Sequence, residues 1–216
     1  MRAIALIVLC AVAALLGARL QGGTGLAATG IPEIDAETRA ATLTFAPDVK
    51  PADRAWILNA VASARPEAQR LIAEVDGLIE IRTDLRHNEA VGLAQMVPGE
   101  SVVSFDVRTL NGERALDRNV VVLHELGHVI DFQLVSDELV QQLDGQIPRV
   151  GDCGGSALLP IGACTAVEER FADTFAKWAL RGRISLAGSG YGIPAPPSIE
   201  DWGAPLGLLA AQLNAR

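Results

Sequence analysis

The sequence predicts an α+β domain in which a small mixed sheet is followed by a helical half. Two observations support this class. The first half of the chain contains short segments with the composition or alternation of strands, and the second half contains segments whose apolar residues recur at helical spacing. We find no internal repeat, low-complexity tract or internal linker in the sequence. This order of elements is typical of α+β domains.

The expected strands are short and lie before the centre of the chain. Residues 43–45 form the first, and residues 78–82 alternate as a half-buried strand should. Residues 91–96 and 101–107 flank a segment that contains Pro98-Gly99. Proline followed by glycine is typical of a type II turn, so these last two strands are expected to form a hairpin.

Four further signals place helices around these strands. Residues 51–75 have helical spacing, and Pro66 divides them, either as a kink or as the first residue of a second helix. Ser136 is expected to cap a short helix that ends near residues 143–145. Residues 206–213 are expected to form a last short helix.

The stretch 120–132 carries the motif H-E-x-x-H, with His124, Glu125 and His128. Two histidines four residues apart on a helix point to the same side, so they can hold one metal ion. Glu125 can then face a water on that metal. Apolar residues surround the motif, so its helix is expected to be buried. The alternative is a chance match on a core helix whose histidines have other partners.

A second helix is expected at residues 167–178, with an aromatic stripe on one side. Glu169 and Asp173 stand one turn apart on another side. If Glu169 is the third ligand of the metal, Asp173 is placed to accept the free ring N–H of a ligating histidine. The alternative is the solvated acidic face of an amphipathic helix.

The two motifs together resemble the gluzincin metallopeptidases. That family joins H-E-x-x-H to a glutamate on a later helix in the pattern E-x-x-A-D, and residues 169–173 read Glu-Arg-Phe-Ala-Asp. Within the family the chain is most similar to small single-domain members, including those similar to the anthrax lethal factor catalytic domain. The resemblance is specific over residues 120–132 and 167–178 and loose elsewhere.

The resemblance implies a zincin-like fold, a bound Zn²⁺ and peptidase activity. Glu125 would be the general base. Tyr191, the only tyrosine, lies in a glycine-rich segment downstream, and some gluzincins place a loop tyrosine on the oxyanion; no motif fixes that role here. The zinc ligands would be His124, His128 and Glu169.

Two other classes of metal-dependent hydrolase, the metzincins and the peptide deformylases, fit the sequence less well than the gluzincins. A metzincin would need glycine and then histidine or aspartate where Asp131 and Leu134 stand. Asp131 is therefore expected to be a structural acid or to contact a ligand. His87 lies in a polar segment and is expected to be solvated. A peptide deformylase would need an upstream cysteine ligand, which the chain lacks between Cys10 and Cys153.

The N-terminus has the features of a targeting segment. A positive start at Arg2 is followed by the apolar run 3–17, which is short for a membrane span and typical of a signal peptide. We expect residues 1–28 to be the signal peptide and residues 29–216 to be a single zincin-like metallopeptidase domain. An uncleaved N-terminal anchor is the alternative.

Charge and cysteine content agree with export. Removing residues 1–28 removes two of the 18 basic residues and none of the 26 acidic ones, which leaves 16 − 26 = −10. This charge argues against nucleic acid and anionic membrane surfaces as partners. Cys153 and Cys164 remain, and a disulfide between them would add roughly 2–3 kcal/mol. The rival role, a cysteine as metal ligand, is unnecessary if Glu169 completes the site.

The sequence therefore predicts a secreted or otherwise extracytoplasmic zinc-dependent endopeptidase with a peptide or protein substrate. One strand of the hairpin at 91–107 is expected to form the rim of its cleft, because extended peptides often pair with a sheet edge. Two alternatives remain open. One is a non-catalytic module that binds zinc or a partner, and the other is an exported zinc hydrolase that acts on a non-peptide amide.

Overall fold

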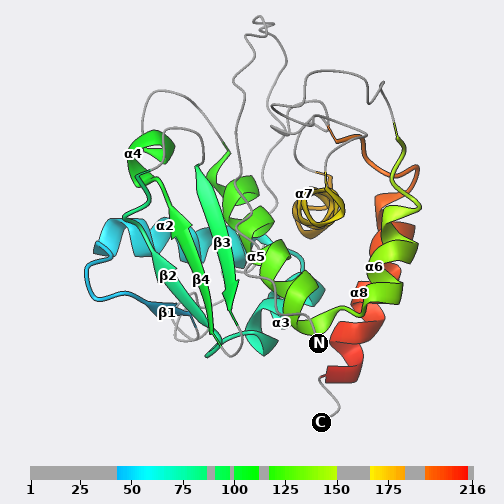
Figure 1. Cartoon of the computed structure of the whole chain (residues 1–216), viewed down its shortest axis with the longest axis horizontal. Helices are drawn as coiled ribbons and strands as arrows, with labels where there is room; N and C mark the ends of the chain where they lie inside the picture. The colour runs from blue at the N-terminus through cyan, green and yellow to red at the C-terminus, as the bar shows by residue number, and fades with distance from the viewer. Residues whose placement is uncertain are drawn as a thin grey trace, which may run out of the picture.

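The computed structural model describes residues 43–86, 91–97, 100–111, 117–149, 166–182 and 193–213. Within them it is an α+β structure with a small mixed sheet on one side and a group of helices on the other (Figure 1). The expected signal peptide, His87, both cysteines of the expected disulfide and Tyr191 lie outside the described residues. These expectations therefore stay predictions.

The sheet contains the four strands that the sequence predicts, in the order β1-β2-β4-β3. Strand β1 (Thr44–Phe45) pairs in parallel with β2 (Ile79–Arg82), and β2 pairs in parallel with β4 (Glu100–Phe105). Strand β3 (Gly92–Val97) is antiparallel to β4, so the expected hairpin is confirmed. Among the described strands, β3 stands at one end of the order.

Two helices connect β1 to β2. Helix α2 (Pro51–Ser63) packs beside the sheet, where the Trp56 ring meets the edge of Phe105 at a centroid distance of 5.9 Å. Helix α3 (Pro66–Glu74) begins at Pro66, so the second of the two alternatives for that proline is correct. Proline suits the first turn of a helix because the N–H it lacks would have no partner there.

The prediction for the end of β4 was wrong. The strand ends at Phe105, not at residue 107, and the short helix α4 (Val107–Leu110) follows. Asp106 causes the change, because its carboxylate accepts hydrogen bonds from the backbone N–H groups of Arg108 and Thr109. An aspartate in this position caps a helix and ends the strand before it.

The motif helix and the helix after it are both capped as their sequences suggest. Helix α5 (Arg118–Leu134) begins after Asp117, whose carboxylate accepts from two backbone N–H groups. Helix α6 (Asp137–Asp144) begins after Ser136, whose Oγ accepts from the N–H of Leu139 at 3.3 Å. The predicted cap at Ser136 is thus confirmed.

The last two helices complete the helical half. Helix α7 (Val167–Ala179) agrees with its prediction, whereas α8 (Ile199–Leu213) begins well before the predicted start at Leu206. Pro205 lies inside α8, in a position where the sequence suggested a helix start. At Gly203, α8 approaches the indole of Trp178 so closely that a side chain there would overlap the ring.

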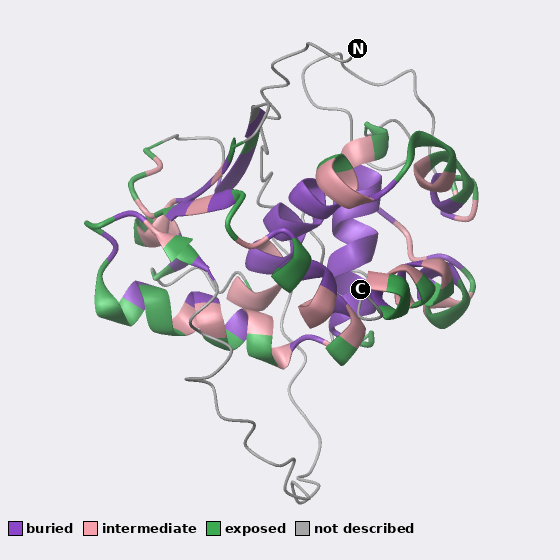
Figure 2. Cartoon of the chain, turned by 90° about the horizontal axis from the view of Figure 1, so that it is seen from below, coloured by how far each residue is buried: buried purple, intermediate pink, exposed green. Residues whose placement is uncertain are grey.

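Burial is greatest in α5 and α7 (Figure 2). Residues 122–130 of α5 are all buried, as the apolar flanks of the motif predicted. Residues 169–179 of α7 are buried on every side of the helix, including Glu169 and Asp173. The solvated acidic face is therefore ruled out as an explanation of these carboxylates. None of the described helices is both long and apolar enough to cross a membrane.

Candidate metal centre

The candidate site lies where α5 and α7 touch. A Cβ atom on Gly127 would stand 3.1 Å from the Cα of Ala172 and 3.3 Å from its carbonyl oxygen. Such distances are tighter than most contacts of a Cβ atom, so a side chain at residue 127 would require the helices to separate by a few tenths of an ångström. Gly127 lies between His124 and His128 along the helix. The close approach therefore falls at the level of the two histidines.

Three side chains that can bind a metal converge across this contact. The Nε2 atoms of His124 and His128 are 3.2 Å apart, and His124 Nε2 is 3.2 Å from Glu169 Oε2. His128 Nε2 is 3.6 Å from Glu169 Oε1. The three side chains are buried, and they form a group that can hold a metal ion.

These distances agree with the size of a metal's coordination sphere. Tetrahedral ligands at about 2.0–2.1 Å from zinc lie about 3.3–3.4 Å from one another. The two distances from His124 Nε2, both 3.2 Å, are close to that value, and the 3.6 Å distance joins His128 Nε2 to the other carboxylate oxygen, Oε1. Two imidazoles and one carboxylate are also a common ligand set for catalytic zinc. The residues present therefore fit a zinc ion.

The charges at the site favour a cation between the three residues. Burial lowers the pKa of His124, but the hydrogen bond to Glu169 and the charges of Glu125, Glu169 and Asp173 outweigh it and raise that pKa. Burial likewise raises the pKa of Glu169, and the bonds and charges of the two histidines outweigh it and lower that pKa well below its usual range. A metal would replace the proton on His124, so its binding would weaken at low pH.

The two ring nitrogens of His128 have different surroundings. Its Nε2 faces the other two ligands, while its Nδ1 is buried and has no hydrogen-bond partner in the described structure. A buried polar atom without a partner is unfavourable, and such atoms are rare in folded proteins. A metal at Nε2 would not relieve this, since a ligating histidine normally donates its other ring N–H to a partner.

Glu125 lies on the side of the site that faces the sheet. It is 1% exposed, and its charge is among those that raise the pKa of His124. Gly92, the first residue of β3, touches this carboxylate: a Cβ on Gly92 would overlap Oε1 of Glu125 and stand 2.7 Å from its Cγ and Cδ. The predicted general base is thus held between α5 and the end strand β3.

Asp173 has a different partner from the one expected. Its carboxylate forms a buried ion pair with Lys177, one turn further along α7, and Lys177 Nζ also donates to the carbonyl of Ile193 at 2.6 Å. Within the described residues no hydrogen bond joins Asp173 to either histidine ring. A buried ammonium needs a counter-charge, which explains the pairing. Asp173 acts on His124 through its charge.

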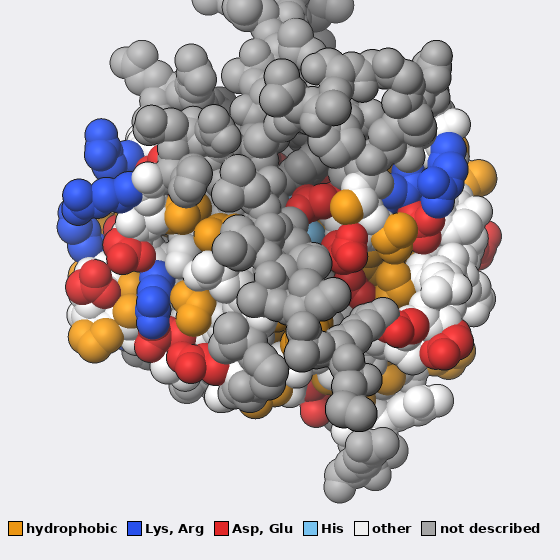
Figure 3. Space-filling model, in the orientation of Figure 1, with side chains coloured by type: hydrophobic (Ala, Val, Ile, Leu, Met, Phe, Trp, Pro, Cys, Tyr) orange, Lys and Arg blue, Asp and Glu red, His pale blue; other side chains and the backbone are white. Residues whose placement is uncertain are grey.

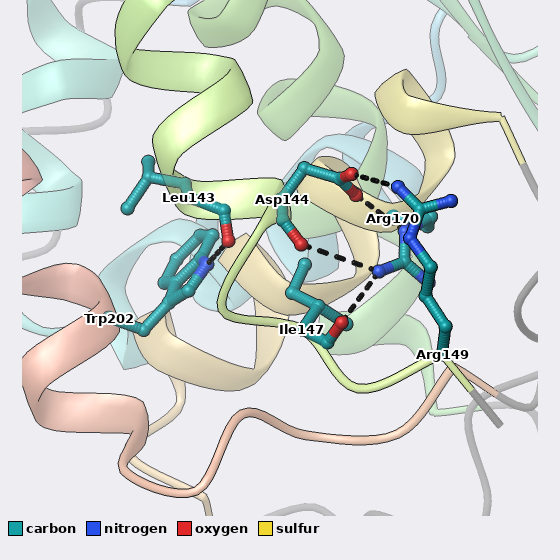
Figure 4. Close-up of polar contacts among 6 residues, drawn as sticks. All are labelled: Leu143, Asp144, Ile147, Arg149, Arg170 and Trp202. Carbon is teal, nitrogen blue, oxygen red and sulfur yellow. Dashed lines mark hydrogen bonds and ion pairs between the residues drawn. The ribbon is translucent and has the colours of Figure 1, made fainter.

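Arg170, the neighbour of Glu169 in the sequence, ties α7 to the end of α6 (Figure 4). Its Nε donates to Asp144 Oδ1 at 2.5 Å, and its Nη2 donates to the carbonyl of Ile147 at 2.9 Å. Arg149 binds the other oxygen of Asp144 at 2.6 Å. Two neighbouring residues thus connect α7 to different parts of the structure: Glu169 to the candidate metal site, and Arg170 to the end of α6.

The site reaches the surface only slightly. His124 is 5% exposed and Glu169 is 6% exposed. Figure 3 shows histidine atoms deep between acidic side chains near the middle of one face. Asp131 is not one of the grouped ligands among the described residues, and its expected structural role stays a prediction.

Sequence reasoning placed the ligands but missed the residues that make room for them. Gly92, Gly127 and Ala172 matter because they lack bulk where two elements meet. A glycine at the start of an expected strand is a weak signal of close approach and could have drawn attention to Gly92. The partners of Arg170 lie outside any motif, so no sequence signal marked them. Asp173 and Lys177 stand four residues apart on one helix, a spacing that could have indicated their ion pair.

Comparison of this chain with models of known protein families, with curated proteins and with solved structures gave no match.

Proposed function

We propose that this protein is a zinc-dependent endopeptidase of zincin-like fold, secreted or otherwise extracytoplasmic. One observation carries the proposal: two histidines and a glutamate from separate helices converge in a buried site, and a second glutamate lies beside them. A site that only stabilises the fold has no need of that second carboxylate. The extracytoplasmic location rests on the N-terminal sequence alone.

The proposed reaction is hydrolysis of a peptide bond. Zinc held by His124, His128 and Glu169 would supply a Lewis acid that lowers the pKa of a coordinated water to about 7. As the oxygen of the attacking water bonds to the peptide carbonyl carbon, Glu125 accepts a proton from that water. The C–N bond then breaks, and Glu125 passes the proton to the leaving amine. Tyr191 remains a candidate donor to the oxyanion on the sequence evidence.

The position of β3 supports a peptide substrate. This strand ends the sheet order among the described strands, and its first residue touches Glu125. An extended peptide that paired with β3 would run past the general base. A hairpin beside the site is the arrangement expected for the rim of a substrate cleft. We include in the proposal that the substrate peptide pairs with β3.

A zinc hydrolase acting on a non-peptide amide would use the same residues in the same roles. A non-catalytic binding module would use the ligands without Glu125. The position of Glu125, buried beside the candidate ligands, favours an enzyme over the module, because a binding module has no use for a general base.

The decisive experiment compares the parent with Glu125→Gln. Glutamine keeps nearly the same shape but cannot accept the proton. Both proteins should bind about one zinc per chain, and hydrolysis of a peptide library should fall by about 10²–10⁴ in the variant. Chelation should abolish the parent's activity, and added zinc should restore it.

Three results would point elsewhere. Zinc binding without cleavage of any peptide, but with cleavage of other amides, would favour the non-peptide hydrolase. Zinc binding with no hydrolysis at all would favour the binding module. A parent that binds no metal would remove the proposal altogether.

A further inference from the structure

Gly92 stands out because the three nearest atoms that a side chain there would meet all belong to the proposed general base. Those atoms are Oε1, Cδ and Cγ of Glu125, and the two carbons would lie 2.7 Å from the added Cβ. Real Cβ atoms do not come so close to other heavy atoms, so one of the two residues would have to move.

The backbone of Gly92 does not itself require glycine. Its φ is not positive, unlike that of Gly77 and Gly182, so alanine can adopt the same conformation. Gly92 pairs with Phe105 in the sheet, and the N–H of Asp106 donates to the carbonyl of Val91 at 3.0 Å. The start of β3 is therefore fixed, and it cannot easily withdraw from α5.

If residue 92 carried a side chain, the Glu125 side chain is the group that would have to move. Its side chain is almost wholly buried, and α5 is packed against the sheet on one side and α7 on the other. The three candidate ligands project from α5 and α7, and none of their atoms is among those nearest to Gly92. A side chain at position 92 would thus displace the carboxylate of Glu125 and leave the ligands in place.

We propose that Gly92 is a positioning residue: the absence of a side chain there allows the Glu125 carboxylate to lie beside the metal ligands. The proposal rests on the proposed function for its effect on catalysis. Its steric part concerns Gly92 and Glu125 alone and can be tested without metal or substrate.

The steric test is a double-mutant cycle of Gly92→Ala and Glu125→Ala, followed by urea unfolding of the metal-free proteins. In the parent background, Gly92→Ala should lower the unfolding midpoint or prevent folding. In the Glu125→Ala background the added methyl has space, so the same change should have a much smaller effect. Gly207→Ala is the control, because its Cβ would meet only Glu67 Cγ at an ordinary 3.9 Å.

The catalytic test uses the zinc-loaded proteins. Gly92→Ala should bind zinc as tightly as the parent, while kcat falls by about 10²–10⁴, as expected for loss of a positioned base. In the Glu125→Gln background Gly92→Ala should cause no further loss of activity. A crystal structure of the variant should show the Glu125 carboxylate in another rotamer.

Equal effects of Gly92→Ala on unfolding in both backgrounds would overturn the proposal, and so would full activity in Gly92→Ala. If the parent binds zinc but hydrolyses nothing, the proposed function fails, and the unfolding cycle still decides whether Gly92 positions Glu125. The two failures are therefore distinguishable.

Discussion

Glu168 and Glu169 are neighbours in the sequence, and the fold gives them different surroundings. Glu169 is buried with its carboxylate 3.2 Å from His124 Nε2, whereas Glu168 is half-buried and is not part of the ligand group. The E-x-x-A-D pattern selected the same residue from its spacing. The two glutamates therefore form a natural pair for a test of the third ligand.

We expect Glu169→Ala to reduce zinc affinity severely, because it removes one of the three candidate ligands and the carboxylate that lies beside both imidazoles. Glu168→Ala should bind zinc nearly as well as the parent. Isothermal titration with zinc, or competition with a chromophoric chelator, measures both affinities. Equal losses, or a larger loss in Glu168→Ala, would mean that Glu169 is not the ligand.

At the scale of elements, the contact between α5 and α7 depends on small residues. Gly127 faces the backbone of Ala172, and a Cβ at 127 would also stand 3.2 Å from the ring of Phe175. Backbone atoms cannot turn aside as a flexible side chain can. A side chain at position 127 therefore requires the two helices to shift by a few tenths of an ångström at the level of the candidate ligands.

Gly127→Ala tests this contact. Alanine favours a helix over glycine by about 1 kcal/mol, but overpacking a tight contact costs about 1–3 kcal/mol. We expect a net loss of up to about 2 kcal/mol in urea unfolding, together with weaker zinc binding, since the ligands sit on both helices. In Gly207→Ala, which meets only an ordinary contact, the helix preference should dominate and stability should rise. A stabilised Gly127→Ala with unchanged zinc affinity would refute this account.

The sequence was sufficient for features that depend on local pattern. The spacing of His124 and His128 on one side of a helix, the cap at Ser136 and the alternation in β2 are all set by residues within a few positions of one another. The sheet order and the tight contacts at Gly92 and Gly127 depend on residues far apart in the chain. Periodicity does not contain that information.

Two local expectations failed for reasons that are also instructive. Asp106 was included in a strand although aspartate commonly caps helices, and it does so here for α4. Asp173 was expected to bind a histidine ring, and the buried Lys177 on the same helix binds it instead. In both cases the carboxylate binds a group within four residues of it in the sequence.

At the scale of the whole molecule, the candidate metal joins two parts. Helix α5 packs against the sheet and α2, whereas α7 packs against α6 and α8 (Figure 1). His124 and His128 belong to the first part, and Glu169 belongs to the second. A metal held by all three residues would link the sheet to the helical half.

Metal removal should therefore lower the unfolding temperature of the whole chain. With free zinc at about 100 times its dissociation constant, binding adds about 2.7 kcal/mol, or about 5–10 °C for a domain of this size. Differential scanning calorimetry with and without a chelator measures the difference. Glu169→Ala should unfold at the same temperature in both conditions, and an unchanged parent would argue that no metal links the two parts.

The junction of Glu169 and Arg170 bears on how natural variants of this chain should be interpreted. Asp144 lies on α6, well outside both motifs, yet it holds Arg170 by an ion pair, and the next residue back along the rigid helix is the candidate ligand. An Asp144→Asn allele would leave Arg170 buried without a counter-charge and shift α7 at the position of Glu169. Such an allele should be grouped with changes to the metal site, although it alters no ligand.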